Sequence, residues 1–144
     1  MHVADEEKVK YSLSGGDIRR VLNLLQTTAM PSEEVKEITV YLTSGAPLPT
    51  YVQAISHSLL NDDFVDAQSK ITTLYKKKGY AMADILSELT IMVSGMDLPA
   101  GALAKILDEM SGVEYRLAFG TDEEIQCASL VGVFVRARAM MTVK

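Results

Sequence analysis

Thr121–Val135 reads TDEEIQCASLVGVFV, and this segment decides the fold class. Its first four residues form a capping-box pattern, in which a threonine and a glutamate three residues later satisfy unpaired N–H groups at a helix start. The residues that follow predict a helix to about Met141 that is apolar on nearly every side in its middle. A helix of that kind is buried on several sides. We therefore expect it at the centre of a helical bundle.

Four apolar stripes with helical period precede this segment and predict four more helices. Asn61-Asp62 closes the first stripe, Gly79 closes the second, and Pro99 opens the fourth, which ends at Gly120. No segment alternates in the way of a half-buried strand, so the fold class is all-α, with a bundle of about five helices. The stripes consist of Tyr51, Val52, Ile55, Leu59 and Leu60; Phe64, Ala67, Ile71, Leu74 and Tyr75; Ile85, Leu86, Leu89, Met92, Val93 and Met96; and Leu103, Ile106, Leu107, Met110, Val113 and Leu117.

The chain before the bundle also has helical spacing. One helix is predicted from Asp17 to about Met30, and another begins at Ser32. Thr43–Pro49 is the most linker-like stretch, with a glycine and two prolines among small polar residues. We place the domain boundary there, which predicts domains at 1–45 and 46–144.

Composition and charge limit the possible function classes. The 144 residues are 48% hydrophobic and 23% charged, as in a soluble folded domain. The net charge is −5, so direct binding to DNA needs a local basic patch. The one basic run, Lys76-Lys77-Lys78 before Gly79, is interpreted as a helix C-terminus with its glycine cap rather than as a nucleic-acid patch. No signal peptide and no apolar run long enough for a membrane span is visible, so we expect an intracellular protein.

The residues that usually perform catalysis or bind metals are sparse. The two histidines are His2 and His57, and no glutamate lies three or four residues from His57, so no metal site is expected. Cys127 lies in an apolar run and is interpreted as a buried, inert thiol. The sequence contains no G-x-x-x-x-G-K-[ST] loop for a nucleotide. Nothing in it supports catalysis by the chain alone.

Two arginines are the main candidates for a binding site. The segment Ser14–Gln26 reads SGGDIRRVLNLLQ and places Arg19 and Arg20 in the first turn of a predicted helix. The N-terminus of a helix carries partial positive charge, so arginines there suggest a nearby anion such as phosphate. A solvated surface pair explains the same spacing equally well.

Several segments resemble one family. Gly16–Gln26 resembles the sensor-2 motif of AAA+ clamp loaders, specifically the small subunits of replication factor C. Tyr41–Pro47 looks like the passage from lid to collar in that family, and Glu114–Leu117 with Glu124–Gln126 looks like the end of its collar domain. The resemblance extends over nearly the whole chain from about residue 11.

The resemblance implies both an architecture and a role. It makes 1–45 a partial AAA+ lid domain and 46–144 a collar domain for oligomerisation, without the ATPase module of a full small subunit. Arg19 would be the sensor-2 arginine that reaches the γ-phosphate of ATP in the full-length subunit, with Arg20 as the fallback. No cofactor is expected for this chain itself, whereas the full-length subunit would bind ATP with Mg.

The implied function belongs to a complex and not to this chain alone. Five different subunits of the family join through their collars into a heteropentamer, which loads the sliding clamp onto primed DNA in the nucleus during replication and repair. The resemblance therefore implies a scaffold that is not an enzyme on its own, that contacts the clamp and primed DNA through the whole complex, and that has no membrane partner.

Two other functions stay open. The chain could be a stand-alone helical adaptor whose arginines bind an acidic or phosphorylated partner, in which case it should begin with a complete, capped helix. A lid-plus-collar piece should instead leave an unpaired apolar face near residues 18 to 42. The chain could also be an enzyme with its own nucleotide site, which would require saturable ATP binding.

Overall fold

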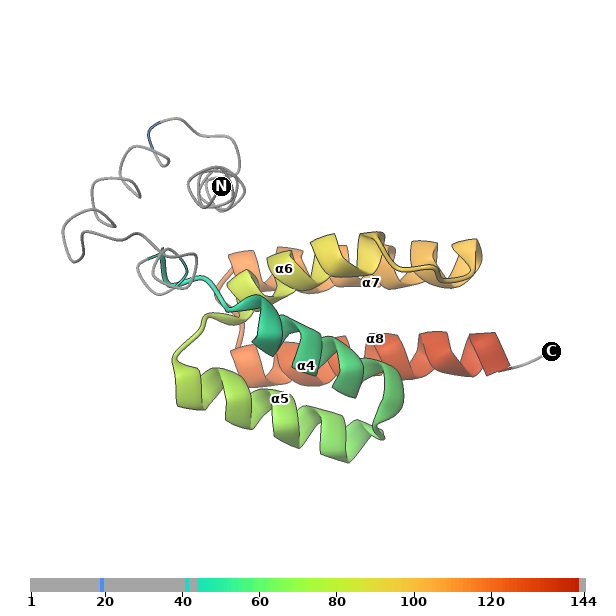
Figure 1. Ribbon diagram of the computed structural model, residues 1–144, viewed down its shortest axis with the longest axis horizontal. Coiled ribbons are helices and arrows are strands. Elements are labelled where there is room, and N and C mark those ends of the chain that lie inside the picture. The colour runs from blue at the N-terminus through green and yellow to red at the C-terminus, as the bar shows by residue number, and fades with distance from the viewer. Residues whose placement is uncertain (1–18, 20–40, 42–43, 143–144) are drawn as a thin grey trace, which may run out of the picture. The chain divides into compact units, whose positions relative to one another are not determined.

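The chain forms a bundle of α-helices in the part that the structure describes. The computed structural model describes residues 19, 41 and 44–142, and no strand occurs among them (Figure 1). The all-α fold with five helices in the bundle is therefore confirmed. In chain order the helices are α4 (Pro49–Asn61), α5 (Phe64–Lys78), α6 (Met82–Ser94), α7 (Ala100–Ala118) and α8 (Glu123–Thr142).

Two compact units divide the chain, Met1–Leu48 and Pro49–Lys144. The second unit contains the bundle. The helices predicted before residue 43 and the expected apolar face near residues 18 to 42 lie almost wholly outside the described residues. The partial lid and the boundary between residues 45 and 46 therefore stay predictions.

The last helix occupies the centre of the bundle, as its sequence predicts. α8 packs against α7, α5 and α4, and Figure 1 shows it behind α4. Phe134 and Leu130 in its middle are almost completely buried. Because three helices surround α8, apolar residues are needed on most of its circumference. Its buried residues are Gln126, Cys127, Leu130, Val131, Val133, Phe134 and Ala137.

The apolar stripes of the other helices form the rest of the core. The helices α4, α5 and α6 bury most of their predicted stripes, and α7 buries half of its stripe and partly buries the rest. Ile55, Ile71, Leu89 and Ile106 are each no more than 1% exposed. Phe64 is the exception, because its side chain is 39% exposed. Phe64 is the first residue of α5, and helical side chains lean toward the N-terminus, so this side chain points past the end of the helix.

Residues at the helix ends act mostly as predicted. Gly79 adopts a left-handed conformation with φ of 73° after Lys78, and its N–H donates to the carbonyl of Tyr75 at 2.8 Å. A non-glycine residue would be strained there. The lysines in the last turn of α5 complement the helix dipole, which confirms the helix C-terminus predicted at this run.

The start of α8 differs from the predicted capping box. Asp122, not Thr121, caps the helix: its Oδ1 accepts hydrogen bonds from the N–H groups of Glu124 and Ile125 at 2.9 and 3.0 Å. The Thr121 hydroxyl instead donates to the carbonyl of Arg116 at 2.8 Å. The end of α7 lies close enough to engage this hydroxyl, and the next residue supplies a carboxylate, which caps a helix as well as threonine does.

Candidate assembly surface

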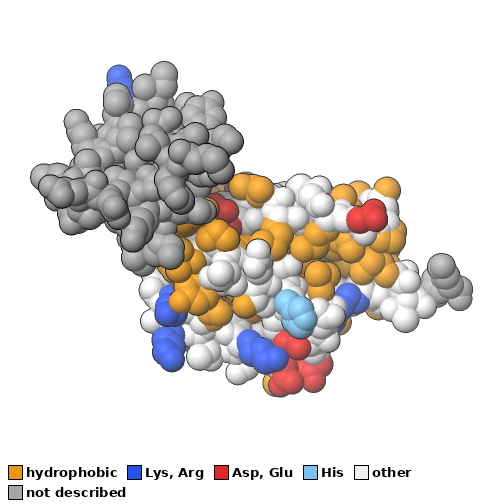
Figure 2. All heavy atoms as spheres, viewed as in Figure 1, with side chains coloured by type: hydrophobic (Ala, Val, Ile, Leu, Met, Phe, Trp, Pro, Cys, Tyr) orange, Lys and Arg blue, Asp and Glu red, His pale blue; other side chains and the backbone are white. Residues whose placement is uncertain are grey.

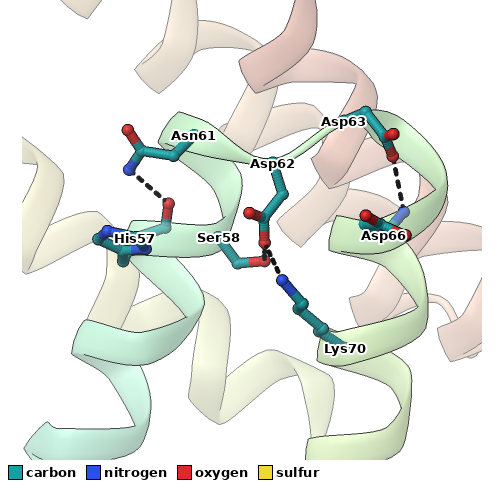
Figure 3. Close-up of polar contacts among 7 residues, drawn as sticks. All are labelled: His57, Ser58, Asn61, Asp62, Asp63, Asp66 and Lys70. Atoms are coloured by element: carbon teal, nitrogen blue, oxygen red, sulfur yellow. Dashed lines mark hydrogen bonds and ion pairs between the residues drawn. The ribbon is translucent and has the colours of Figure 1, made fainter.

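The described residues contain no arrangement that could hold a metal ion. No group of three or more His, Cys, Asp or Glu side chains converges within residues 44–142. His57 is exposed on α4, where its carbonyl accepts a hydrogen bond from the side chain of Asn61 (Figure 3).

Cys127 is buried, as predicted from its apolar surroundings. Its side chain is fully inaccessible to solvent, and burial raises the pKa of the thiol. A thiol needs a lowered pKa and access to solvent to act as a nucleophile at neutral pH. Cys127 therefore belongs to the core and not to a reactive site.

Of the two arginines predicted as phosphate ligands, the structure describes Arg19. Arg19 is helical and exposed, and Arg20 lies outside the described residues. The roles that the resemblance implies for Arg19 and Arg20 stay predictions.

Polar contacts fix the end of α7 against the start of α8. Arg116 Nε donates to Oε1 of Gln126 at 2.8 Å, and Arg116 Nη2 donates to the Ser129 hydroxyl at 3.0 Å. Gln126 is buried, so this contact satisfies a polar group inside the bundle. Farther along the same two helices, Glu109 forms an ion pair with Arg136. The Arg116 hydrogen bonds and this ion pair together fix the position of α7 along α8.

An exposed aromatic pair lies beside these contacts. Tyr115 and Phe119 are one turn apart at the end of α7, and their side chains are 66% and 72% exposed. The ring centroids are 4.8 Å apart, so the two rings form one apolar surface. Ile125, near the start of α8, is 65% exposed. Exposed aromatic groups of this size commonly mark a surface that contacts another protein.

The sequence carries a signal for this surface that the stripe analysis does not use. Val113 and Leu117 lie on the inward stripe of α7, whereas Tyr115 and Phe119 are two positions away from them, which is about half a turn. An aromatic residue outside the buried stripe is therefore a candidate contact. Periodicity alone leaves open whether a second apolar face is covered by the same chain or by another, and here the described residues leave it exposed.

None of the helices in the described part of the chain has the length and apolar character of a membrane span.

The chain is similar to known proteins of one family. The model of the replication factor C C-terminal domain matches residues 47–133. Replication factor C subunit 5 of Homo sapiens is 41% identical over 149 residues, which cover 97% of this chain and 44% of that protein. Replication factor C subunit 3 of Oryza sativa is 36% identical over 129 residues, which cover 90% of this chain and 36% of that protein.

The match to these relatives covers most of this chain and less than half of each relative. Replication factor C subunit 3 of Schizosaccharomyces pombe is 30% identical over 127 residues, which cover 88% of this chain and 37% of that protein. The matched domain includes nearly all of the bundle, from before α4 to the middle of α8, and with it the aromatic pair on α7. The chain belongs to the replication factor C family and contains the C-terminal domain of that family.

Proposed function

We propose that this chain is an assembly module, which joins its subunit to different subunits of a replication factor C complex. The observation that carries the proposal is the exposed pair Tyr115–Phe119 in a chain of this family. Paired aromatic rings bury a large area while losing little side-chain entropy, so they are typical anchors of protein interfaces. The hydrogen bonds from Arg116 to Gln126 and Ser129 fix the end of α7, and with it the position of the two aromatic side chains.

In the full-length subunit, the assembly module would hold its subunit in a clamp-loading complex. That subunit is part of an AAA+ ATPase that uses ATP with Mg to load the sliding clamp onto primed DNA in the nucleus, during replication and repair. The chain has no ATPase activity of its own, and it reaches the clamp and the DNA only through the complete heteropentamer. Family membership and the resemblance of residues 16–26 to the sensor-2 motif support this proposal.

Arg19 is the residue that couples this part of the subunit to the nucleotide. A guanidinium group stays charged at neutral pH and makes forked contacts to phosphate oxygens, as a sensor of the γ-phosphate requires. Arg19 is exposed, so Arg19→Ala should change the stability of this chain by no more than about 0.5 kcal/mol. In the full-length subunit the same change should weaken ATP-dependent clamp loading. Normal loading would contradict the assignment and leave Arg20 as the candidate.

The assembly proposal is tested by light scattering. The chain is measured alone and mixed with the C-terminal domains of the other replication factor C small subunits. We expect a heteromer only in the mixture, and we expect Tyr115→Ser/Phe119→Ser to abolish it. Truncation of an anchor in the centre of an interface costs about 2 kcal/mol or more, which is at least about thirtyfold in affinity for each residue.

Ile91→Ser is the matched control, because Ile91 is 64% exposed on α6 and resembles Tyr115 in exposure. The control should assemble like the wild type, and thermal unfolding should show that all variants are folded. A chain that stays monomeric with every partner would contradict the assembly role and favour the stand-alone adaptor. Equal loss with Ile91→Ser would mean that the aromatic pair is not the specific contact.

A further inference from the structure

A groove separates α4 from α5 on a side of the bundle to which α7 does not contribute. Its volume is about 540 Å³, and residues of these two helices alone line it. The lining residues repeat at intervals of three or four along each helix, so the groove follows both helices for about two turns. They are Tyr51, Ala54, Ile55 and Ser58 on α4, and Ser69, Lys70, Ile71, Thr73, Leu74, Lys77 and Lys78 on α5.

The floor of the groove is apolar. Ile55 and Ile71 are each 1% exposed, so they lie beneath the groove and are already out of water. The apolar surface that a ligand can reach comes from Tyr51 and Leu74, which are half-buried. Ala54 on α4 is exposed and small, so it leaves the space between the helices open. Apolar side chains of a ligand that cover these accessible groups remove hydrocarbon from water, which favours binding.

The rim of the groove is positively charged. Three lysines line it, and no aspartate or glutamate is among the lining residues. Figure 2 shows Lys or Arg side chains along the edge of the bundle over α5, with Asp or Glu side chains near one end of that edge. All basic residues of α5 are lysines. This local charge is opposite to the net charge of −5 of the chain.

The three rim lysines differ in their own partners. At one end of the groove Lys70 pairs with Asp62 at 2.8 Å, and Asp62 also accepts a hydrogen bond from Ser58 (Figure 3). At the other end the ammonium of Lys78 lies 4.9 Å from the centre of the Tyr51 ring, and Lys77 is exposed. Asp62 partly neutralises the first end, so within residues 44–142 the positive charge of the rim is concentrated at Lys77 and Lys78.

We propose that this groove docks an acidic, amphipathic helix of a protein partner. Three turns of an α-helix occupy about 1,300 Å³, from a diameter of about 10 Å and a pitch of 5.4 Å, so the groove can receive one face of such a helix and not its whole width. That face would place apolar residues spaced i, i+3 or i+4, and i+7 onto Tyr51, Ala54 and Leu74. Its acidic residues would pair with Lys77 and Lys78. One bound helix would therefore make the apolar and the charged contacts at the same time.

A nucleic acid is the other polyanion that lysines attract, and the groove fits it less well. Binding to phosphates alone would leave the apolar floor between α4 and α5 uncovered or facing charged oxygens. Three lysines, one of them paired with Asp62, also give a small charge for a nucleic-acid surface, and the chain as a whole repels phosphate. The combination of an apolar floor and a basic rim favours the peptide.

Fluorescence anisotropy with the whole chain tests the proposal. The probe is a labelled synthetic peptide of about 16 residues, a little more than four helical turns, with leucine on one face and glutamate on the other. A second peptide has the same charge but serine in place of each leucine, and a third probe is a single-stranded oligonucleotide. We expect saturable binding of the first peptide only. Equal binding of both peptides, preferred binding of the oligonucleotide, or no binding of the first peptide would overturn the proposal.

Two charge-matched variants locate the site. Lys77→Gln removes one positive charge at the rim and should weaken binding of the first peptide about two- to fivefold, the range for one exposed ion pair. Ser111→Asp changes the net charge by the same amount at an exposed position on α7, away from the groove, and should leave the affinity unchanged. An equal effect of the two variants would mean that only the net charge matters, and it would overturn the assignment to this groove.

Discussion

Arg116 connects α7 to α8 through a buried partner, and its replacement gives a measurable loss of stability. The guanidinium donates to Oε1 of Gln126 at 2.8 Å and to the Ser129 hydroxyl at 3.0 Å. Gln126 is 4% exposed, so bulk water cannot replace the Arg116 guanidinium as the hydrogen-bond donor to its amide oxygen. Arg116→Met keeps most of the aliphatic stem and removes both hydrogen bonds.

The expected loss of stability depends on whether the polar group that keeps no partner is buried or exposed. Leaving a buried polar group without its partner costs about 1–3 kcal/mol, whereas the partly exposed Ser129 can turn to water at little cost. We therefore expect Arg116→Met to lower the free energy of unfolding by about 2 kcal/mol. Gln126→Met should cost about 1 kcal/mol or less, because the guanidinium that remains is at the surface and can be hydrated. The double variant should lose less than the two single variants together, with a coupling of about 1 kcal/mol or more.

Urea denaturation at neutral pH, followed by far-UV circular dichroism, measures these differences. The slope of the free energy against urea should be the same for all variants, so that the midpoints report stability. Arg138→Met removes one positive charge from α8, away from this contact, and serves as the control for net charge. A loss below about 0.5 kcal/mol for Arg116→Met, or single losses that simply add, would refute the reasoning.

Three further predictions concern the same two helices. Arg136 holds the pKa of Glu109 below its ordinary value near 4.5, so the carboxylate stabilises the fold above that value by up to about 1 kcal/mol. The stability gap between wild type and Glu109→Gln should narrow as the pH falls below about 4.5, and a gap independent of pH would contradict this. Cys127 should react with a thiol reagent only as fast as the chain opens, because it is fully buried with a raised pKa; immediate reaction in native buffer would contradict its burial. Gly112→Ala should raise stability by about 0.5–1 kcal/mol, since the added Cβ would meet the end of the Arg116 side chain at 3.4 Å and nothing nearer; a loss would show that this guanidinium cannot shift.

The number and the ends of the bundle helices were predictable because they depend on local properties. A helical repeat of apolar residues shows which face each helix buries, and Gly79 and Pro99 mark helix ends through their own backbone preferences. Thr121 shows where such reasoning stops. The capping-box pattern is present, but the Thr121 hydroxyl bonds to the carbonyl of Arg116, five residues earlier at the end of α7. Two helix ends therefore compete for one hydroxyl, and the pattern alone does not show which of them it serves.

The candidate sites were predictable to different degrees. The role of Arg19 and Arg20 stays a prediction, which rests on a motif that the sequence displays directly. The rim of the groove was visible only as a run of lysines before Gly79. The structure shows that Lys76 turns to Glu124 at 2.7 Å, while Lys77 and Lys78 line the groove. Neighbours in sequence thus serve different surfaces, because successive residues of a helix point about 100° apart.

The sequence by itself determined an all-α chain, the inward face of each bundle helix and the central position of α8, since helical periodicity and helix capping act over a few residues. Only the tertiary structure decided which apolar side chains remain uncovered. Tyr115 and Phe119 stay exposed, and α4 and α5 leave a groove between them, because these features depend on where the neighbouring helices end. A side chain is buried by residues that are distant in the sequence, and a local pattern does not show whether those residues reach it in space.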